Sequence, residues 1–431
     1  MKSLIRSLVR LFYRLVEVSG GEHLPGDGPL LLVANHFNGL VDAMIVLAVL
    51  PRPVVFVAKS TLWKIPVLST LLDLMGVVPV VRRSDLPEEK GPASSRNDAS
   101  LERLARVLAG GGAVLIFPEG RSHSDPALSP IKTGAARILT MSGVPAAVVP
   151  LGLWFTRKEA FRSEVLVKVG APVVPAGTSV DAWTEAIRDG LEAVTLNAES
   201  WRQHEAARAL EAIYGDALPA GGSLEASFGR QRLLHEAREV LARVDPESVS
   251  RLARRAAAFE RLCARAGLAP AELDGAASET RPRRAAAGVL WRALLGLPPA
   301  LLGALAFYVP YRLVGLLAPR LAREQRDQVA FLKLLLGMLL HPLALAVEVL
   351  LVGRAFGAAA AVIAALLLPA CGIVALLWAD AVEPYTGRFR ALAANLFAAG
   401  RSGLSFLRAE REALRAECAR LQDVYLHNRA P

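Results

Sequence analysis

Cysteine is scarce in this chain. Its 431 residues include three cysteines, Cys263, Cys371 and Cys418, which are too few and too widely spaced for a disulfide framework or a zinc ligand set. A G-x-S-x-G nucleophile elbow is missing too, which argues against a serine lipase or esterase. We therefore expect a protein that faces a reducing compartment and has no metal site.

Negative charge is in deficit as well. Lys and Arg number 50 against 40 Asp and Glu, so the formal net charge is +10. Such an excess suits an anionic partner, namely a membrane surface, a phosphorylated substrate or a nucleic acid. We do not expect nucleic acid as a partner, because no recognised binding motif or basic–aromatic stripe accompanies the charge. A lipid bilayer and a phosphorylated substrate remain the expected partners.

The N-terminus lacks the uninterrupted apolar core of a secretory signal peptide. Lys2, Arg6, Arg10 and Arg14 are each four residues apart and form one cationic stripe, with leucines on the other side of the same helix. This pattern predicts an amphipathic helix over residues 1–17 that lies in the membrane interface, with its arginines toward anionic headgroups. The alternative is an ordinary amphipathic helix packed on its own domain.

Residues 18–178 alternate between strand-like and helical segments. Continuous apolar runs such as "LLLVAN", "VVFVAK" and "AVLIFPEG" are typical of buried strands, and stretches such as "DASLERLARVLAGG" between them have helical periodicity. The alternation predicts an α/β domain with a largely parallel sheet flanked by helices. Residues 179–285 are arginine-rich with helical spacing, which predicts a separate helical region.

The hydrophobic residues, 53% of the chain, are concentrated in residues 286–380. The run 355–379 has no charge and is long enough to span a bilayer, and the run 329–353 is of similar length. We expect these two runs to form a transmembrane hairpin, and basic flanks favour both of its ends on the cytoplasmic side. A further segment, 293–311, is broken by three prolines, so its path is left open. Residues 381–431 are expected to form a charged, solvated helical tail.

The stretch "LLVANHFNGLVDAMIV" places a histidine and an aspartate inside an apolar run. In one unbroken helix, His36 and Asp42 would lie roughly 240° apart, on different sides. The Asn-Gly pair between them is a strong turn signal, which favours a strand, a loop and a following helix. Asp42 then lies in the first helical turn, and the loop can fold His36 back against it.

Three further motifs follow other predicted strands in chain order. Arg82 and Arg83 end "GVVPVVRR" over 76–83, and the stretch "FPEGRSHSD" over 117–125 contains a Pro-Glu-Gly turn and an arginine. The stretch "VVPLG" over 148–152 ends another predicted strand with Pro150. Ligands bind outside the carboxyl ends of the strands in open α/β sheets. The motifs can therefore converge with His36 on one site.

Taken together, the four motifs resemble those of the glycerophosphate acyltransferase family, over the part of the chain from Asn35 to Gly152. The family's first motif usually has four residues between its histidine and its aspartate, whereas this chain has five. That spacing, with "FPEGRSHSDPALSPIKTGAARI" and "FRSEVLVKVGAPV", looks like the branch of glycerol-3-phosphate and dihydroxyacetone-phosphate acyltransferases, which also carries a C-terminal membrane hairpin.

The resemblance implies transfer of a fatty acyl group from acyl-CoA or acyl carrier protein to glycerol 3-phosphate or dihydroxyacetone phosphate, in phospholipid synthesis. No cofactor is expected besides this acyl donor. The location implied is a membrane, the bacterial inner membrane, with the catalytic domain on its cytoplasmic face. The main alternative acceptor is lysophosphatidate (1-acylglycerol 3-phosphate). An alternative of another class is a non-catalytic membrane lipid-binding protein, although such a protein would not need both His36 and Asp42.

These residue types suit the implied reaction. Neutral His36 can accept the proton of the acceptor's hydroxyl, while Asp42 fixes the tautomer of the imidazole and stabilises the imidazolium. The acceptor's phosphate needs cations and backbone donors, since a guanidinium binds phosphate bidentately. We expect Glu119 to orient an arginine, and His123 to be local structure. The expected substrate-binding residues are Arg82, Arg83, Glu119, Gly120, Arg121, Lys132 and Pro150.

Overall fold

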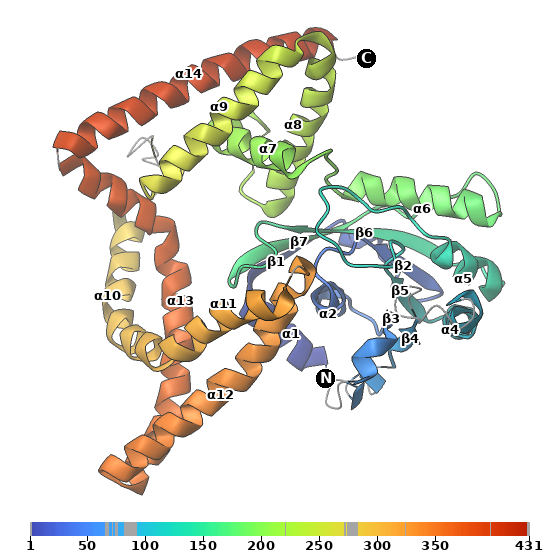
Figure 1. Cartoon of the computed structure of the whole chain (residues 1–431), viewed down its shortest axis with the longest axis horizontal. Coiled ribbons are helices and arrows are strands. Elements are labelled where there is room, and N and C mark those ends of the chain that lie inside the picture. The colour runs from blue at the N-terminus through green and yellow to red at the C-terminus, as the bar shows by residue number, and fades with distance from the viewer. Residues whose placement is uncertain are drawn as a thin grey trace. The chain divides into compact units, whose positions relative to one another are not determined.

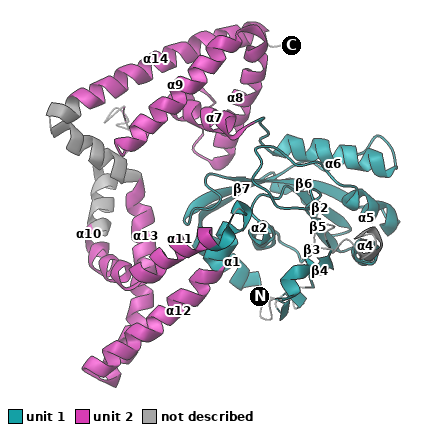
Figure 2. Ribbon diagram, in the orientation of Figure 1, with its two compact units in different colours: residues 1–199, 321–334 teal, residues 200–320, 335–431 magenta. Residues whose placement is uncertain are grey.

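The computed structural model describes residues 2–64, 69–70, 72–73, 76–81, 93–219, 221–270, 273, 283–323, 325–396 and 398–428. The chain forms two compact units, coloured separately in Figure 2. Unit 1 comprises Met1–Glu199 together with the later segment Leu321–Leu334, and unit 2 comprises Ser200–Arg320 and Leu335–Pro431. Each unit has its own hydrophobic core.

A seven-stranded sheet forms the centre of unit 1 within the described residues. Across the sheet, the strands are β1 (Tyr13–Ser19), β7 (Ser163–Val169), β6 (Ala147–Phe155), β2 (Leu30–Ala34), β5 (Ala113–Ile116), β3 (Val55–Lys59) and β4 (Val78–Val80) (Figure 1). Neighbouring strands run parallel except β6 and β7, which are antiparallel. The predicted α/β fold with a largely parallel sheet is confirmed.

Helices cover both faces of this sheet. One face packs against α1 (Lys2–Phe12) and α2 (Leu40–Val49), and the other against α4 (Ala93–Ala109), α5 (Gly134–Ser142) and α6 (Val180–Val194). Successive side chains of β2 alternate between the two cores, so Leu32 packs on the α1–α2 side and Leu31 on the other. Because both faces of the sheet are buried, the central strands are apolar throughout instead of alternating between apolar and polar residues. This agrees with the prediction of buried strands from continuous apolar runs.

The N-terminal helix is shorter than the predicted span of 1–17. It ends at Phe12, because Tyr13–Ser19 forms β1 and pairs in parallel with β7. On its cationic side, the Lys2 ammonium donates to the Leu50 carbonyl and Arg6 Nε donates to the Ala48 carbonyl. These carbonyls are at the C-terminus of α2, where cations are favoured.

These contacts of α1 differ from the prediction of a helix whose cations all face lipid headgroups. Lys2 and Arg6 face protein carbonyls instead of headgroups, and Ile5 and Val9 are buried in the core of unit 1. On the leucine side, Leu4 is 54% and Leu11 is 46% exposed, and Lys2, Arg6 and Arg10 are exposed as well. The helix packs on its own domain through Ile5 and Val9, as the alternative describes, and a role in the membrane interface remains a prediction.

Helix α6 belongs to the α/β unit, although we expected the helical region to begin at residue 179. Its N-terminus is capped by Ser179, whose hydroxyl accepts from the Ala182 N–H at 3.1 Å. Its C-terminus lies directly on β6, since a Cβ built on Gly152 would be 1.9 Å from the Val194 carbonyl oxygen. The boundary between the units consequently falls at Glu199.

Unit 2 is helical over its described residues. The elements are α7 (Trp201–Tyr214), α8 (Leu224–Val244), α9 (Pro246–Arg265), α10 (Arg283–Ala306), α11 (Tyr308–Ala322), α12 (Val329–Phe356), α13 (Ala358–Leu396) and α14 (Ala398–Asn428) (Figure 1). The C-terminal end of α11 and the start of α12 belong to unit 1. Helices α7, α8, α9 and α14 share one hydrophobic core.

The C-terminal tail is not a solvated helix throughout. In α14, Leu407, Leu414 and Leu421 are buried in the core of unit 2. Their spacing of seven residues places them on one face, a pattern that the many charges of the tail obscured in the sequence. Arg255 of α9 also binds Glu410 of α14 at 2.8 Å.

Among the described residues, two helices are long and apolar enough to cross a membrane: Arg326–Phe356 and Ala358–Glu383. They cover the two predicted spans, and Gly357, with φ of 90°, separates them. Gly353 lies close to Ala361 across this turn, but beyond the turn α13 packs against α10 rather than along α12, so a packed hairpin of the two runs remains a prediction. Leu294–Ala306 and Tyr308–Ala322 form a bent pair with an angle of 53° at the break, so the segment at 293–311 is a broken helix and a third candidate span.

Candidate active site

His36 and Asp42 lie together at the carboxyl end of β2. The Nδ1 atom of His36 is 3.0 Å from Oδ2 of Asp42, which is in the first turn of α2. The Asp42 side chain is fully buried, while 12% of the His36 side chain is exposed. A carboxylate accepts a hydrogen bond from Nδ1–H, which leaves Nε2 as the nitrogen that can accept a proton. The pair has the arrangement of a general base with its orienting acid.

The backbone between the two residues is tightly constrained. The Asn35 side chain continues the sheet, donating to the Leu153 carbonyl at 3.1 Å and accepting from the Leu153 N–H at 2.7 Å. Gly39 has a φ of 55°, a conformation that favours glycine. The Asn38 N–H donates to Asp42 Oδ2 at 2.7 Å, so this one oxygen holds both the histidine ring and the turn.

The "FPEG" motif after β5 supports His36 from the other side. The ring of Phe117 stacks on the imidazole with a centroid distance of 4.1 Å. The Glu119 carboxylate accepts from the His36 N–H at 2.7 Å and from the Ser129 N–H at 2.7 Å. His123 Nε2 forms a third hydrogen bond to this carboxylate, which is fully buried.

Among the described residues no arginine binds Glu119, although we expected from the sequence that Glu119 would orient one. Its partners among the described residues are the backbone of His36 and Ser129 and the ring of His123. A buried carboxylate is stable only when its oxygens accept several hydrogen bonds, and here these come from the loop of His36 and from the loop of Glu119 itself. The residue is a support for the backbone of His36.

His123 is a buried structural histidine in contact with the site. Its Nδ1 accepts from the Asp125 N–H at 3.1 Å, so the proton is on Nε2, which donates to Glu119. Its backbone N–H donates to the His36 carbonyl at 3.1 Å. The contact with Asp125 is local, as we predicted for His123. The contact with His36 depends on the tertiary fold.

Lys158 was missed by the sequence analysis. Its ammonium donates to the Phe37 carbonyl at 2.9 Å and to Ser124 Oγ at 2.7 Å. Its own carbonyl accepts from Asn38 Nδ2 at 3.0 Å. Burial lowers the pKa of Lys158 from its usual value, and the negative charge of Asp42 opposes this effect. Lys158 thus connects the loop of His36 with the loop after Glu119.

A buried tyrosine supports the same loop. Tyr13, the first residue of β1, accepts from Asn38 Nδ2 at 2.8 Å and donates to the Lys158 carbonyl at 3.3 Å. Burial raises the pKa of Tyr13 well above its ordinary value, with a further contribution from Asp42, so its phenol stays protonated. Neither Tyr13 nor Lys158 lies in a motif, and only the closure of the sheet brings them to His36.

The predicted cations fall into two groups. Arg82 and Arg83 lie outside the described residues. Arg121 is 59% exposed and lies 3.2 Å from the Asp125 carboxylate. Gly120 has a φ of 71°, and the ammonium of Lys132 would be 2.7 Å from a Cβ at this position. The absence of a side chain at Gly120 thus allows Lys132 to lie over the backbone beside Arg121.

Pro150 is not at a strand end. It lies inside β6, which continues to Phe155, and its backbone is opposite Val33 of β2. It is buried, and its ring is the near neighbour of Gly190 of α6 and of Gly170. The predicted position at a strand end is wrong, because β6 extends beyond Pro150 and pairs with β7, while a role of Pro150 in substrate binding remains a prediction.

Among the described residues, no group of three or more His, Cys, Asp or Glu side chains is arranged to hold a metal ion.

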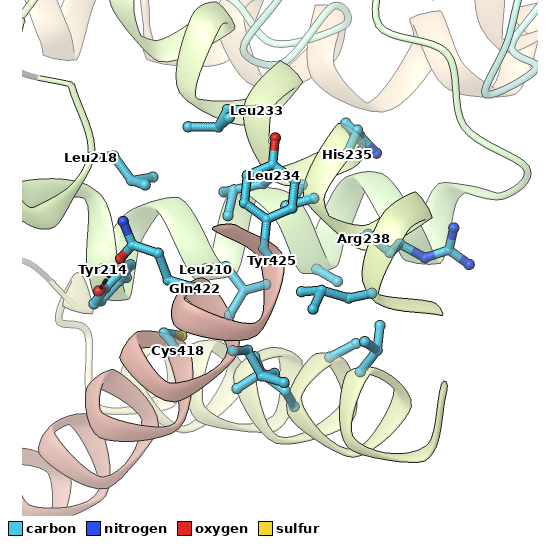
Figure 3. A pocket seen from close by; sticks show the side chains of 18 of the residues that line it. Leu210, Tyr214, Leu218, Leu233, Leu234, His235, Arg238, Cys418, Gln422 and Tyr425 are labelled. Carbon is cyan, nitrogen blue, oxygen red and sulfur yellow. Dashed lines mark hydrogen bonds between the residues drawn. The ribbon is translucent and has the colours of Figure 1, made fainter. Parts of the chain in front are cut away.

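A separate cavity of about 310 Å³ lies inside unit 2, among α7, α8, α9 and α14 (Figure 3). Most of its lining is apolar, and Tyr214 donates to Gln422 Oε1 at 2.7 Å along its wall. Burial raises the pKa of the Cys418 thiol to about 12 and lowers the pKa of His235 to about 4. Both groups are consequently neutral near pH 7.

Part of unit 1 is similar in sequence to known proteins. Residues 15–154 match the model of the acyltransferase family. Over 148 residues the chain is 34% identical to "1-acyl-sn-glycerol-3-phosphate acyltransferase BAT2, chloroplastic" from Brassica napus, a match that covers 34% of this chain and 39% of that protein. Relatives from Arabidopsis thaliana, Borreliella burgdorferi and Homo sapiens also have names that begin with 1-acyl-sn-glycerol-3-phosphate acyltransferase.

A relative with another name matches a shorter part. "Glycerol-3-phosphate O-acyltransferase 2" from Saccharomyces cerevisiae is 39% identical over 84 residues, or 18% of this chain and 11% of that protein. The crystal structure of the 1-acyl-sn-glycerophosphate acyltransferase from Thermotoga maritima aligns with a TM-score of 0.35 and 22% identity, covering 44% of this chain and 77% of that one. The chain thus spans less than half the length of the curated relatives from Brassica and Saccharomyces.

Proposed function

We propose that this chain is a glycerolipid acyltransferase that transfers an acyl group from an acyl thioester to the free hydroxyl of a 1-acylglycerol 3-phosphate. The observation that carries the proposal is the buried His36–Asp42 pair, 3.0 Å apart, within the segment that matches the acyltransferase family. Such a pair activates a hydroxyl without any protein nucleophile, because the acceptor's own hydroxyl takes that part.

The proposed reaction is a direct transfer in a complex of both substrates. Nε2 of His36 accepts the proton of the acceptor's hydroxyl as its oxygen attacks the thioester carbonyl. Asp42 stabilises the imidazolium that forms, as the carboxylate does in a serine hydrolase triad. The tetrahedral intermediate then collapses, the carbon–sulfur bond breaks, and the thiolate takes the proton from the imidazolium. The products are the ester and the free thiol.

Arg121 and Lys132 are the proposed ligands of the acceptor's phosphate. Arg121 is exposed and two residues before His123, whose N–H is bonded to the His36 carbonyl. Gly120 leaves its backbone open next to Lys132. A guanidinium and an ammonium on one loop beside the base suit a phosphate that must be held near the reacting hydroxyl. Arg82 and Arg83 remain proposals for the same role.

The choice of acceptor follows the relatives. The match to the Brassica protein named as a 1-acyl-sn-glycerol-3-phosphate acyltransferase extends over 148 residues, against 84 for the yeast protein named as a glycerol-3-phosphate acyltransferase. We therefore place lysophosphatidate before glycerol 3-phosphate, the reverse of the order favoured by the spacing of the first motif. Glycerol 3-phosphate or dihydroxyacetone phosphate is the second candidate, supported by the yeast relative.

The proposed setting is a membrane surface. Two helices in the described part of the chain are long and apolar enough to cross a bilayer, and lysophosphatidate itself partitions into lipid. Acyl-CoA and acyl carrier protein are both proposed donors. The bacterial inner membrane, with the catalytic unit on its cytoplasmic face, remains the proposed location.

The test is an acyl-transfer assay on the purified full chain in detergent. Long-chain acyl-CoA or acyl carrier protein is offered with lysophosphatidate, glycerol 3-phosphate or dihydroxyacetone phosphate, for the wild type, His36→Ala and the control His427→Ala. His427 is an exposed histidine of α14 bonded to its own helix. We expect fastest transfer to lysophosphatidate, a loss of about 10²–10⁴-fold in His36→Ala, and no loss in the control.

Two results would contradict the proposal. Transfer by folded His36→Ala at the wild-type rate would exclude the general-base role. A wild type that acylates none of the three acceptors with either donor would leave a non-catalytic lipid-binding protein as the better account. Faster transfer to glycerol 3-phosphate would keep the mechanism and reverse the choice of acceptor.

A further inference from the structure

A segment far along the chain completes the catalytic unit. Leu321–Leu334 packs within unit 1, although the chain on both sides of it belongs to unit 2. Ala330 and Leu334, in the first turns of α12, are buried in the same core as α1 and α2. This packing fixes the short helical turn Arg326–Gln328 that immediately precedes α12.

Asp327, in this turn, contacts the two loops of the candidate site. Its carboxylate accepts a hydrogen bond from Ser122 Oγ, 205 positions away in the sequence. Ser122 is adjacent to Arg121, the proposed phosphate ligand. On the side of the catalytic loop, the Asp327 carbonyl oxygen is 3.1 Å from where a Cβ on Gly39 would be. The Asp327 residue is 9% exposed, so these contacts are made away from water.

We infer that Asp327 is a positioning residue for acyl transfer, which holds the loop of Arg121 against the loop of His36 through its hydrogen bond with Ser122. The inference rests on the proposed function. It assigns a part of the reaction to a residue well outside the segment that matches the acyltransferase family, residues 15–154. Asp327 lies at the N-terminal end of the candidate membrane span Arg326–Phe356, so its hydrogen bond connects the loop of Arg121 with the start of that span.

The charge of Asp327 has a second partner. Lys158, whose ammonium bonds Phe37 and Ser124, is buried, which disfavours its charged form. The negative charges that favour its charged form are those of Asp42, Glu159 and Asp327, while Arg326 opposes them. Asp327 thus supports the loop of Ser122 directly and the lysine between the loops by its field.

Another contact keeps the turn in place without the Asp327 side chain. The Lys333 ammonium donates to the Glu159 carbonyl at 2.6 Å, which ties α12 to the hairpin that carries Lys158. Removal of the Asp327 carboxylate should therefore loosen the Ser122 loop without releasing α12. This makes a specific effect on catalysis separable from unfolding.

The experiment is a double-mutant cycle with Asp327→Ala, Ser122→Ala and the double variant, in the full chain in detergent. We expect a rise in the KM for the acceptor of about tenfold to a hundredfold in each single variant, since a buried hydrogen bond to a charged group is lost. The double variant should show no further rise above Asp327→Ala, because the hydrogen bond with Ser122 is already lost in that variant. Asp327→Asn should recover part of the loss, as its amide oxygen still accepts from Ser122.

A matched control and a structural readout complete the test. Asp189→Ala removes an exposed aspartate of α6 and should leave the acceptor KM unchanged. Amide hydrogen exchange in residues 119–129 should be at least about tenfold faster in Asp327→Ala than in the wild type, with the Tm nearly unchanged.

The outcomes separate this inference from the proposed function. Equal acceptor KM in wild type and folded Asp327→Ala, or additive effects in the double variant, would overturn the positioning role. If the wild type acylates no acceptor, the proposed function fails, and the exchange measurement then decides by itself. Unchanged exchange in residues 119–129 would overturn the placement of Asp327 on this loop.

Discussion

Replacement of Glu119 by glutamine separates two accounts of this residue. We expected Glu119 to be one of the substrate-binding residues, whereas in the structure its carboxylate accepts from the His36 N–H, the Ser129 N–H and His123 Nε2. Glu119→Gln keeps the shape and replaces one acceptor oxygen by an NH2 group. At least one of the N–H donors then faces another donor, and the buried negative charge is lost.

The magnitude follows from the hydrogen bonds. A bond to a charged group contributes about 1.5–3 kcal/mol, and an unsatisfied buried donor costs a similar amount. If the loss appears as displacement of the His36 backbone, kcat should fall by about tenfold to a hundredfold, because each 1.4 kcal/mol or so is tenfold in rate. The acceptor KM should change much less, since Glu119 is fully buried and makes its described contacts within the protein.

The assay is steady-state transfer at varied acceptor concentration, for wild type and Glu119→Gln, with the Tm of each measured in the same detergent. A fall in kcat with a nearly constant KM supports the backbone-supporting role. A large rise in KM with unchanged kcat would refute it and return Glu119 to direct acceptor binding.

Two further predictions concern stability. Gly152→Ala should destabilise the protein by about 1–3 kcal/mol, because its Cβ would overlap the Val194 carbonyl oxygen of α6. The control Gly21→Ala, whose Cβ meets nothing within 4 Å, should not destabilise it. Equal Tm values for the two variants would contradict this prediction. His235 has its pKa lowered by burial to about 4 from 6.5, so the unfolded chain binds its proton first and stability should fall as the pH falls from about 6.5 toward 4. Thermal unfolding of His235→Gln should show a smaller fall over this window, and parallel curves for variant and wild type would exclude the effect.

The fold was predictable because apolar runs and turn signals are local. The run before Asn35 could only be a strand buried on both faces, and the Asn-Gly pair marked the turn that brings His36 to Asp42. The two long apolar runs were visible for the same reason, since 355–379 carries no charge and 329–353 carries only Lys333 and Glu348.

The supporting contacts of the site were not predictable from the sequence. Lys158 lies in the turn between β6 and β7, and Asp327 precedes an apolar helix, so no motif marks either residue. The sequence motif marked Glu119 as a candidate site residue. It did not reveal the bond from the His36 N–H, because a backbone N–H has no signature in a sequence. These contacts form only when strands and loops distant in the chain are brought together by the sheet.

The two displaced boundaries have a common physical cause. Periodicity continued the N-terminal helix past Phe12, although pairing with β7 makes Tyr13–Ser19 a strand. The extension of β6 beyond Pro150 also depends on its antiparallel partner. Strand pairing between distant segments decided where both elements end, and it overrides local propensity.

The central claim is that His36 acts as the base under the charge of Asp42, and the rate of acyl transfer by Asp42→Asn tests it most directly. The amide oxygen can still accept from His36 Nδ1 and from the Asn38 N–H, which share Asp42 Oδ2, so chiefly the charge is removed. With the Tm close to that of the wild type, kcat should fall by about a hundredfold or more. Folded Asp42→Asn with the wild-type kcat would contradict the account.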